Sequence, residues 1–133
     1  MIKPQHKHII IRALCEKPPR DCDVAVEWWN ELVDSIGMAK LDIQTNPICG
    51  YVDTPGYAGL TICGIIETSH IAMHVWDESN PALIQLDVYT CSSLDKNKVF
   101  EALDDFDPVK VEYKQFDREY AIKEETNGFK EIY

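Results

Sequence analysis

The order of the predicted elements indicates an α+β fold, a two-layer sandwich in which a largely antiparallel sheet carries two helices on one face. Short apolar or alternating runs predict strands, and two longer segments have the apolar spacing of helices. The order along the chain is strand, helix, three or four strands, helix, strand. Because 133 residues suffice for a single core, residues 1–133 are expected to form one domain without a linker.

The strand predictions rest on side-chain pattern. Residues 7–14 are rich in β-branched side chains, which favours a buried strand. Residues 41–45 alternate Leu, Ile and Thr with polar positions and predict a half-buried strand. Residues 46–59 hold two prolines and three glycines, so they are expected to form a structured loop. Further strands are expected over residues 60–66, 69–76, 82–90 and 109–113.

Two segments have the spacing of helices that pack on a sheet. Asp21 or Asp23 is expected to cap the first helix and Gly37 to close it, whereas Ser92 or Ser93 is expected to cap the second. The two tryptophans of the first helix are expected in the core. The apolar positions are Ala25, Trp28, Trp29, Leu32, Val33 and Ile36 in the first helix and Val99, Phe100 and Leu103 in the second.

The apolar residues near the end of the sequence show no regular spacing of a helix or a strand. After about residue 118 the chain is charged, and it is expected to be a solvated tail or an arm that contacts a partner. Two helices cover only one face of the predicted sheet. A homodimer would cover the other face most economically.

Composition excludes several classes of partner. Thirteen basic residues against twenty-three acidic ones give a formal charge of -10, which repels nucleic acid. No apolar window approaches the ~18 uninterrupted residues of a membrane span. The N-terminus lacks the long apolar segment of a secretory signal, so the cytoplasm is the expected location.

The cysteines and histidines do not form a recognisable metal or disulfide pattern. Five cysteines are an odd number and none forms a C-x-x-C pair, so reduced thiols are expected rather than a disulfide framework or thiolate zinc site. His70 and His74 would share a face of a helix. Since Ile71, Met73 and Val75 alternate with them as in a strand, no metal site is predicted.

The most reactive part of the sequence lies over residues 67–78 and 86–91. It places hydroxyls, two imidazoles, carboxylates and a thiol on or beside two neighbouring predicted strands, more reactive chemistry than packing requires. Each of these residues alone is more often structural than catalytic. The order Ser69-His70, then His74, then Asp-Val-Tyr-Thr-Cys over residues 87–91 is the informative feature.

This order resembles the signature of the bacterial S-adenosylmethionine decarboxylase proenzymes, which cut their own backbone to make a pyruvoyl cofactor. The resemblance implies cleavage between Thr68 and Ser69, with the pyruvoyl group made from Ser69. It assigns His74 to the proton transfers of processing. It also places a hydroxyl eight residues before the serine, here Thr61, where it would polarise the reacting bond.

The resemblance also implies roles in decarboxylation of S-adenosylmethionine for spermidine synthesis. The pyruvoyl ketone would form a Schiff base with the substrate amine and accept the electrons released with carbon dioxide. Cys91, largely a thiol at neutral pH, would return the proton. Glu78 would hold the ribose, and Tyr57 or Trp76 would stack on adenine or face the sulfonium.

Two alternatives stay open at this point. The same scaffold would support a pyruvoyl-dependent decarboxylase of arginine or ornithine. A second alternative is an unprocessed, non-catalytic homologue that binds a ligand or partner. The chain departs from the family at Thr68, where glutamate is usual and a β-branched residue crowds the carbonyl, and at Asp77, where proline is common.

Overall fold

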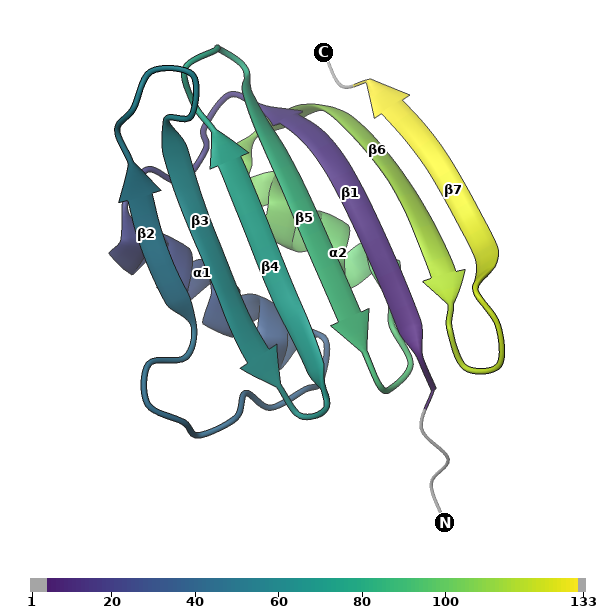
Figure 1. The fold of residues 1–133 in the computed structure, drawn as a ribbon. Helices are drawn as coiled ribbons and strands as arrows, with labels where there is room; N and C mark the ends of the chain where they lie inside the picture. The colour runs from purple at the N-terminus through teal and green to yellow at the C-terminus, as the bar shows by residue number, and fades with distance from the viewer. Residues whose placement is uncertain (1–4, 132–133) are drawn as a thin grey trace.

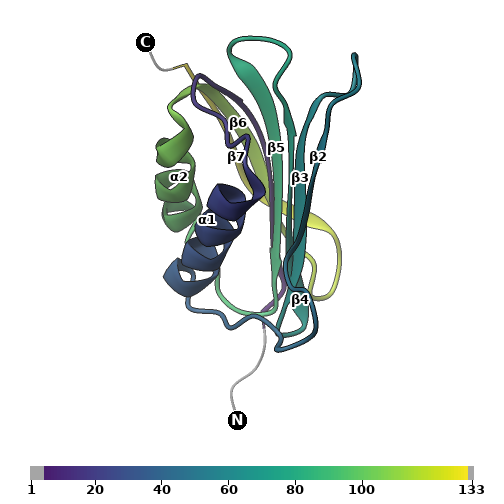
Figure 2. The same ribbon diagram turned by 90° about the vertical axis from the view of Figure 1, so that its left-hand side faces the viewer.

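Seven antiparallel strands and two α-helices make up the part of the chain that the computed structural model describes, residues 5–131 (Figure 1). In chain order the elements are β1 (Lys7–Cys15), α1 (Cys22–Ser35), β2 (Ile48–Val52), β3 (Gly59–Ile66), β4 (Ser69–Trp76), β5 (Ala82–Thr90), α2 (Lys96–Leu103), the 3-10 turn η1 (Asp104–Phe106), β6 (Pro108–Asp117) and β7 (Lys123–Glu131). The spatial order of the strands is β2-β3-β4-β5-β1-β6-β7. Both helices lie on one face, which confirms the predicted α+β sandwich (Figure 2).

The helices begin where short acidic side chains can accept backbone N–H groups. Asp21 caps α1 by accepting from the N–H of Asp23 at 2.6 Å. Asp95, and neither Ser92 nor Ser93, caps α2 by accepting from the N–H of Asn97 at 3.0 Å. The serine prediction was wrong because the chain after β5 runs on for several residues before turning into the helix.

The core lies between the helices and the sheet. Trp29 is fully buried and its indole N–H donates to the carbonyl of Ile71 at 3.2 Å, so α1 is bonded directly to β4. The ring fits because Gly64 on β3 has no side chain, and a methyl group there would collide with it. Trp28 joins the two helices by donating to the carbonyl of Ala102 at 2.8 Å. Both tryptophans are therefore core residues, as predicted.

The predicted strand over residues 41–45 is absent, and a strand lies instead in the predicted loop. Only one isolated bridge, Lys40 with Ile66, pairs this region with the sheet within the described chain. The Asn46 side chain replaces a backbone ladder here, because its amide donates to the carbonyl of Ile65 at 2.7 Å and its oxygen accepts from the N–H of Ile65 at 2.9 Å. The chain then forms β2, which pairs with β3.

The predicted charged tail is also wrong, since residues 123–131 form β7 and pair with β6. Ion pairs also link the two strands, with Lys110 to Glu131 at 3.2 Å and Lys114 to Glu124 at 3.5 Å. An edge strand outside the area covered by the helices needs no apolar alternation. The sequence pattern therefore gave no sign of it.

The cysteine prediction requires a correction too. Cys22 at the start of α1 and Cys49 on β2 form a disulfide, whereas Cys15, Cys63 and Cys91 are free. The pair depends on how α1 packs beside β2, which spacing does not reveal. Burial raises the pKa of the free Cys15 thiol to about 12.

The second face of the sheet carries no helix (Figure 2). We call it the open face. Alternation along the strands places His8, Ile10 and Arg12 of β1 there, with Ile10 40% exposed. No helix among the described residues has the length and apolar character needed to cross a membrane.

Candidate active site

A tight corner between β3 and β4 carries the predicted cleavage position. Ile66 pairs with Ser69, so Glu67 and Thr68 alone make the turn. Thr68 has a φ of 49°, in the left-handed region that a β-branched residue rarely adopts. Backbone strain of this kind persists only where the surroundings hold the chain. The peptide bond after Thr68 therefore follows a strained residue in a two-residue turn.

Ser69 is held by two hydrogen bonds at the buried side of this corner. Its side chain faces the helices, and the residue is 7% exposed. Its Oγ donates to the carbonyl of Glu67 at 3.1 Å and accepts from the backbone N–H of Cys91 at 2.8 Å. A backbone N–H at this distance stabilises negative charge on the serine oxygen.

The thiol of Cys91 reaches the same corner from the end of β5. Its Sγ donates to the carbonyl of Glu67 at 3.3 Å and lies 3.6 Å from Thr68 Oγ1. The structure thus brings together three of the residues singled out in the sequence, Thr68, Ser69 and Cys91. The hydroxyl of Ser69 and the thiol of Cys91 both donate to the carbonyl of Glu67 at this corner.

Thr61 and His74 are also brought together, but elsewhere. They pair across β3 and β4, and Thr61 Oγ1 lies 3.1 Å from His74 Nδ1. His74 is exposed on the open face, whereas Ser69 faces the helices. Five residues of strand separate them, about 17 Å. Within one chain, therefore, His74 is out of reach of Ser69.

The three predicted substrate-binding residues lie at the far end of β4 with His74. Trp76 is half-buried on the open face, with its ring 6.0 Å from that of His74. Glu78 Oε1 accepts from the backbone N–H of Gly56 at 2.5 Å and of Ala58 at 3.3 Å. Tyr57 lies between these two residues and is 72% exposed. Glu78 therefore shapes the loop that presents Tyr57.

Asp77 is a residue of this region that sequence reasoning did not assign. It is buried and accepts from the hydroxyl of Tyr51 at 2.9 Å, and it pairs with Arg20 at 3.4 Å. The hydrogen bond to Asp77 raises the pKa of Tyr51. The replacement of the usual proline at position 77 was the one signal in the sequence. Asp77 and Glu78 together fasten β2 and its loop to the end of β4.

A second polar cluster on the open face was also missed. His8 Nε2 lies 2.5 Å from Asp87 Oδ1, and His70 Nε2 lies 3.7 Å from the same oxygen. Burial acts to raise the pKa of the Asp87 carboxyl, but the hydrogen bond from His8 and the basic groups around the carboxylate hold that pKa below its ordinary value. The sequence could not reveal this cluster because it depends on strand register.

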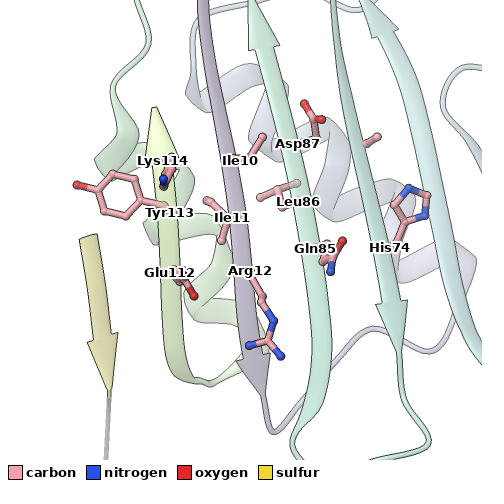
Figure 3. Close-up of a pocket in the computed structure, with 11 residues that line it drawn as sticks. Ile10, Ile11, Arg12, His74, Gln85, Leu86, Asp87, Glu112, Tyr113 and Lys114 are labelled. Carbon is pink, nitrogen blue, oxygen red and sulfur yellow. The ribbon is translucent and has the colours of Figure 1, made fainter. Parts of the chain in front are cut away.

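A hollow of about 430 Å³ lies on the open face between these groups (Figure 3). Arg12, Gln85 and His74 line it from three neighbouring strands in one cross-strand row. Asp87 and Lys114 also line it. Charged side chains of both signs and apolar side chains line the hollow together. Within residues 5–131, no group of three or more His, Cys, Asp or Glu side chains could hold a metal ion.

Known proteins share this sequence pattern and fold. The sequence profile of the family described as S-adenosylmethionine decarboxylase matches residues 14–119. The adenosylmethionine decarboxylase of Aquifex aeolicus has a similar structure, with a TM-score of 0.68, 21% identity, and coverage of 96% of this chain and 100% of that chain. The Trypanosoma brucei AdoMetDC-delta26 monomer gives a TM-score of 0.48, 15% identity, and coverage of 87% of this chain and 47% of that one. The profile spans most of the chain, which therefore belongs to the S-adenosylmethionine decarboxylase family.

Proposed function

We propose that this chain is a pyruvoyl-dependent S-adenosylmethionine decarboxylase that cleaves itself between Thr68 and Ser69 and supplies aminopropyl groups for spermidine synthesis. The observation that carries the proposal is the corner itself, where Ser69 Oγ, the strained Thr68 unit and the Cys91 thiol meet. We also propose the cytoplasm as its location.

Ser69 begins the processing. Its Oγ attacks the carbonyl of Thr68, so the amide becomes an ester and the nitrogen of Ser69 is freed. A base then removes the Cα proton of Ser69, and the carboxylate of Thr68 leaves. Water releases ammonia from the remaining dehydroalanine and a pyruvoyl group results. The N–H of Cys91 stabilises the attacking oxygen, and release of the φ strain at Thr68 favours the first step.

The pyruvoyl group, once formed, supplies a carbonyl that takes up the electrons released when the substrate loses carbon dioxide. The residues of this chain orient the substrate and move its proton. Cys91 donates that proton, since its backbone N–H bonds to Ser69 Oγ and its thiol lies at the same corner, 3.3 Å from the carbonyl of Glu67. Glu78 Oε2, which is outside the two loop hydrogen bonds, accepts from the ribose, and Tyr57 or Trp76 covers the adenine.

His74 and Thr61 enter the site from a second copy of the chain in this proposal. In their own chain they lie about 17 Å from Ser69 along β4 and on the opposite face. A homodimer packed through the open faces would cover that face. It would also set His74 and Thr61 of one copy against the corner of the other.

Intact-mass analysis tests self-cleavage. Purified wild-type protein should give one fragment ending at Thr68 and a second whose N-terminus is blocked to sequencing. The Ser69→Ala protein is the control and should stay whole. A wild-type chain that remains at full mass after long incubation contradicts the proposal and leaves the unprocessed homologue.

Subunit mixing tests the shared site. Ser69→Ala and His74→Ala proteins should each remain uncleaved alone. When the two are co-expressed, the His74→Ala chain keeps its serine and meets an intact His74 on its partner, so it should cleave. Absence of cleavage in the mixed dimer would show that His74 does not act between copies. A His74→Ala chain that cleaves alone would remove His74 from processing.

Calorimetric titration separates the substrates. S-adenosylmethionine, arginine and ornithine are added in turn to processed protein. Tight binding of S-adenosylmethionine supports the proposal. Binding of a basic amino acid without S-adenosylmethionine would instead favour the arginine or ornithine decarboxylase.

A further inference from the structure

A chain of side-chain contacts crosses three adjacent strands and ends beside the cleavage corner. We call it the cross-strand network; its members are Arg118, His8, Asp87, Tyr89 and His70. Arg118 follows β6, and the others lie on β1, β5 and β4, which are neighbours in the sheet (Figure 1). The mechanism proposed above uses none of these residues.

The protons of the network have one consistent arrangement. Arg118 Nη1 lies 3.3 Å from His8 Nδ1, and a guanidinium only donates, so Nδ1 must accept. His8 therefore carries its proton on Nε2 and donates it to Asp87 at 2.5 Å. With its side chain 18% exposed and both ring nitrogens engaged, His8 is a fixed support for the Asp87 carboxylate.

The Asp87 carboxylate also faces His70, and the ring of Tyr89 contacts both His70 and Arg118. His70 stacks on Tyr89 with ring centroids 5.6 Å apart and an interplanar angle of 27°. The guanidinium of Arg118 lies 4.7 Å from the centre of the Tyr89 ring, a cation–π contact. The Tyr89 hydroxyl lies 3.0 Å from His6 Nδ1. His70 is thus flanked by a charge and an aromatic face on the open side of the sheet.

His70 directly follows Ser69. Contacts of the His70 side chain therefore act on the backbone next to the Thr68–Ser69 bond, where cleavage is proposed. On the buried side, Ser69 Oγ and the Cys91 N–H fix the corner. These hydrogen bonds lie on the helix side and do not restrain the corner from the open face. Thr68 has a left-handed backbone conformation, which persists only where the surroundings restrain it. The cross-strand network contacts His70, the residue after Ser69, from that face.

We propose that Asp87, through His70, is a positioning residue for backbone cleavage, which holds the Thr68–Ser69 bond in the geometry that Ser69 attacks. This inference rests on the proposed self-cleavage. It predicts that the network acts on the first step, ester formation, and leaves the later elimination alone. Arg118 and His8 contribute by keeping the Asp87 carboxylate in place.

Asp87→Asn tests the proposal because it keeps the size of the side chain and removes its charge. Cleavage is followed by intact mass with and without hydroxylamine, which cuts any ester that has formed. Ester formation should slow at least tenfold, with no ester accumulating. Arg118→Gln, a change near the surface, should slow the same step by a smaller factor. Glu101→Gln on α2 makes the same carboxylate-to-amide change on the other layer and should cleave at the wild-type rate.

Hydrogen exchange tests the restraint without requiring cleavage. In a Ser69→Ala background, Asp87→Asn should speed amide exchange over residues 67–70 several-fold more than it speeds exchange in the core strands. Unchanged exchange at the corner would overturn the inference. So would faster exchange with a wild-type rate of ester formation, or accumulation of ester in Asp87→Asn. A wild-type chain that never cleaves overturns the proposed function instead, and the exchange result then stands as the test of the restraint.

Discussion

Ser69 Oγ accepts a 2.8 Å hydrogen bond from the backbone N–H of Cys91, so the candidate nucleophile and proton donor are fixed relative to each other before any cleavage. The bond uses the main chain of Cys91 and leaves its thiol to contact Glu67 and Thr68. The two functions of Cys91 can therefore be separated by changing the side chain alone.

Cys91→Ala should cleave, because the N–H that supports Ser69 remains. Turnover of S-adenosylmethionine should then fall about a hundredfold or more, since the donated proton must come from elsewhere. Release of carbon dioxide by the processed variant measures this. Turnover equal to that of the wild type would mean that Cys91 is a packing residue.

Glu78→Gln should weaken binding of S-adenosylmethionine roughly ten- to a hundredfold, because a charge-assisted hydrogen bond to the ribose is lost. The amide oxygen of glutamine can still accept from the loop, so the unfolding midpoint should change little. Titration calorimetry measures the binding, with Glu101→Gln as the matched control. If Glu78→Gln weakened the binding of ligands without a ribose, such as arginine, by the same factor, Glu78 would act only by shaping the loop.

Gly64→Ala should lower the free energy of unfolding by about 1–3 kcal/mol, because the added methyl group collides with the buried ring of Trp29. Gly50→Ala on edge strand β2 is the control, since a methyl group there meets no atom within 4 Å. Urea unfolding compares the two variants. Equal stabilities would mean that the Trp29 ring can shift without cost.

Reduction of the Cys22–Cys49 disulfide should lower the free energy of unfolding by about 2–4 kcal/mol, because the unfolded chain gains freedom when the loop opens. A Cys22→Ser, Cys49→Ser double variant should show the same loss and no further response to reductant. A wild-type protein whose stability ignores reductant would indicate that the two thiols are not joined in solution.

Acid should remove the contribution of Asp87 to stability. Its pKa is lower in the folded protein than the ordinary value of about 3.9, so its stabilising effect is complete above about pH 4 and is lost as pH falls through the folded value. The stability difference between wild type and Asp87→Asn should therefore be larger at about pH 6 than at about pH 2.5. A difference that is constant with pH would contradict this assignment.

The sequence predicted the elements whose burial has a clear period. β4 and β5 lie under the helices, and their alternation gave their bounds directly. β2 and β7 lie at the two edges of the sheet, where most side chains are exposed and no strict alternation is required. The prolines and glycines around β2 therefore led to the prediction of a loop, and the charged residues of β7 led to the prediction of a tail.

For the candidate site, the sequence motif identified pairs of residues that meet, but not how those pairs are arranged relative to each other. The motif named Ser69 and Cys91, which meet, and Thr61 and His74, which also meet. Five residues of strand and a change of face separate Ser69 from His74 on β4, so the two pairs do not meet within one chain. Asp87 with His8 depends on the placement of β1 between β5 and β6, a long-range pairing that no local pattern encodes.

The strand order has a consequence for a chain cut once at residue 68. The first piece would contain β1, β2 and β3, and the second β4 to β7, yet β1 lies between β5 and β6, and β3 lies against β4. Strands of the two polypeptides would therefore be interleaved in one sheet, with β1 of the first piece between two strands of the second. Neither could leave without breaking three ladders at once, so a severed backbone would still behave as one cooperative folding unit.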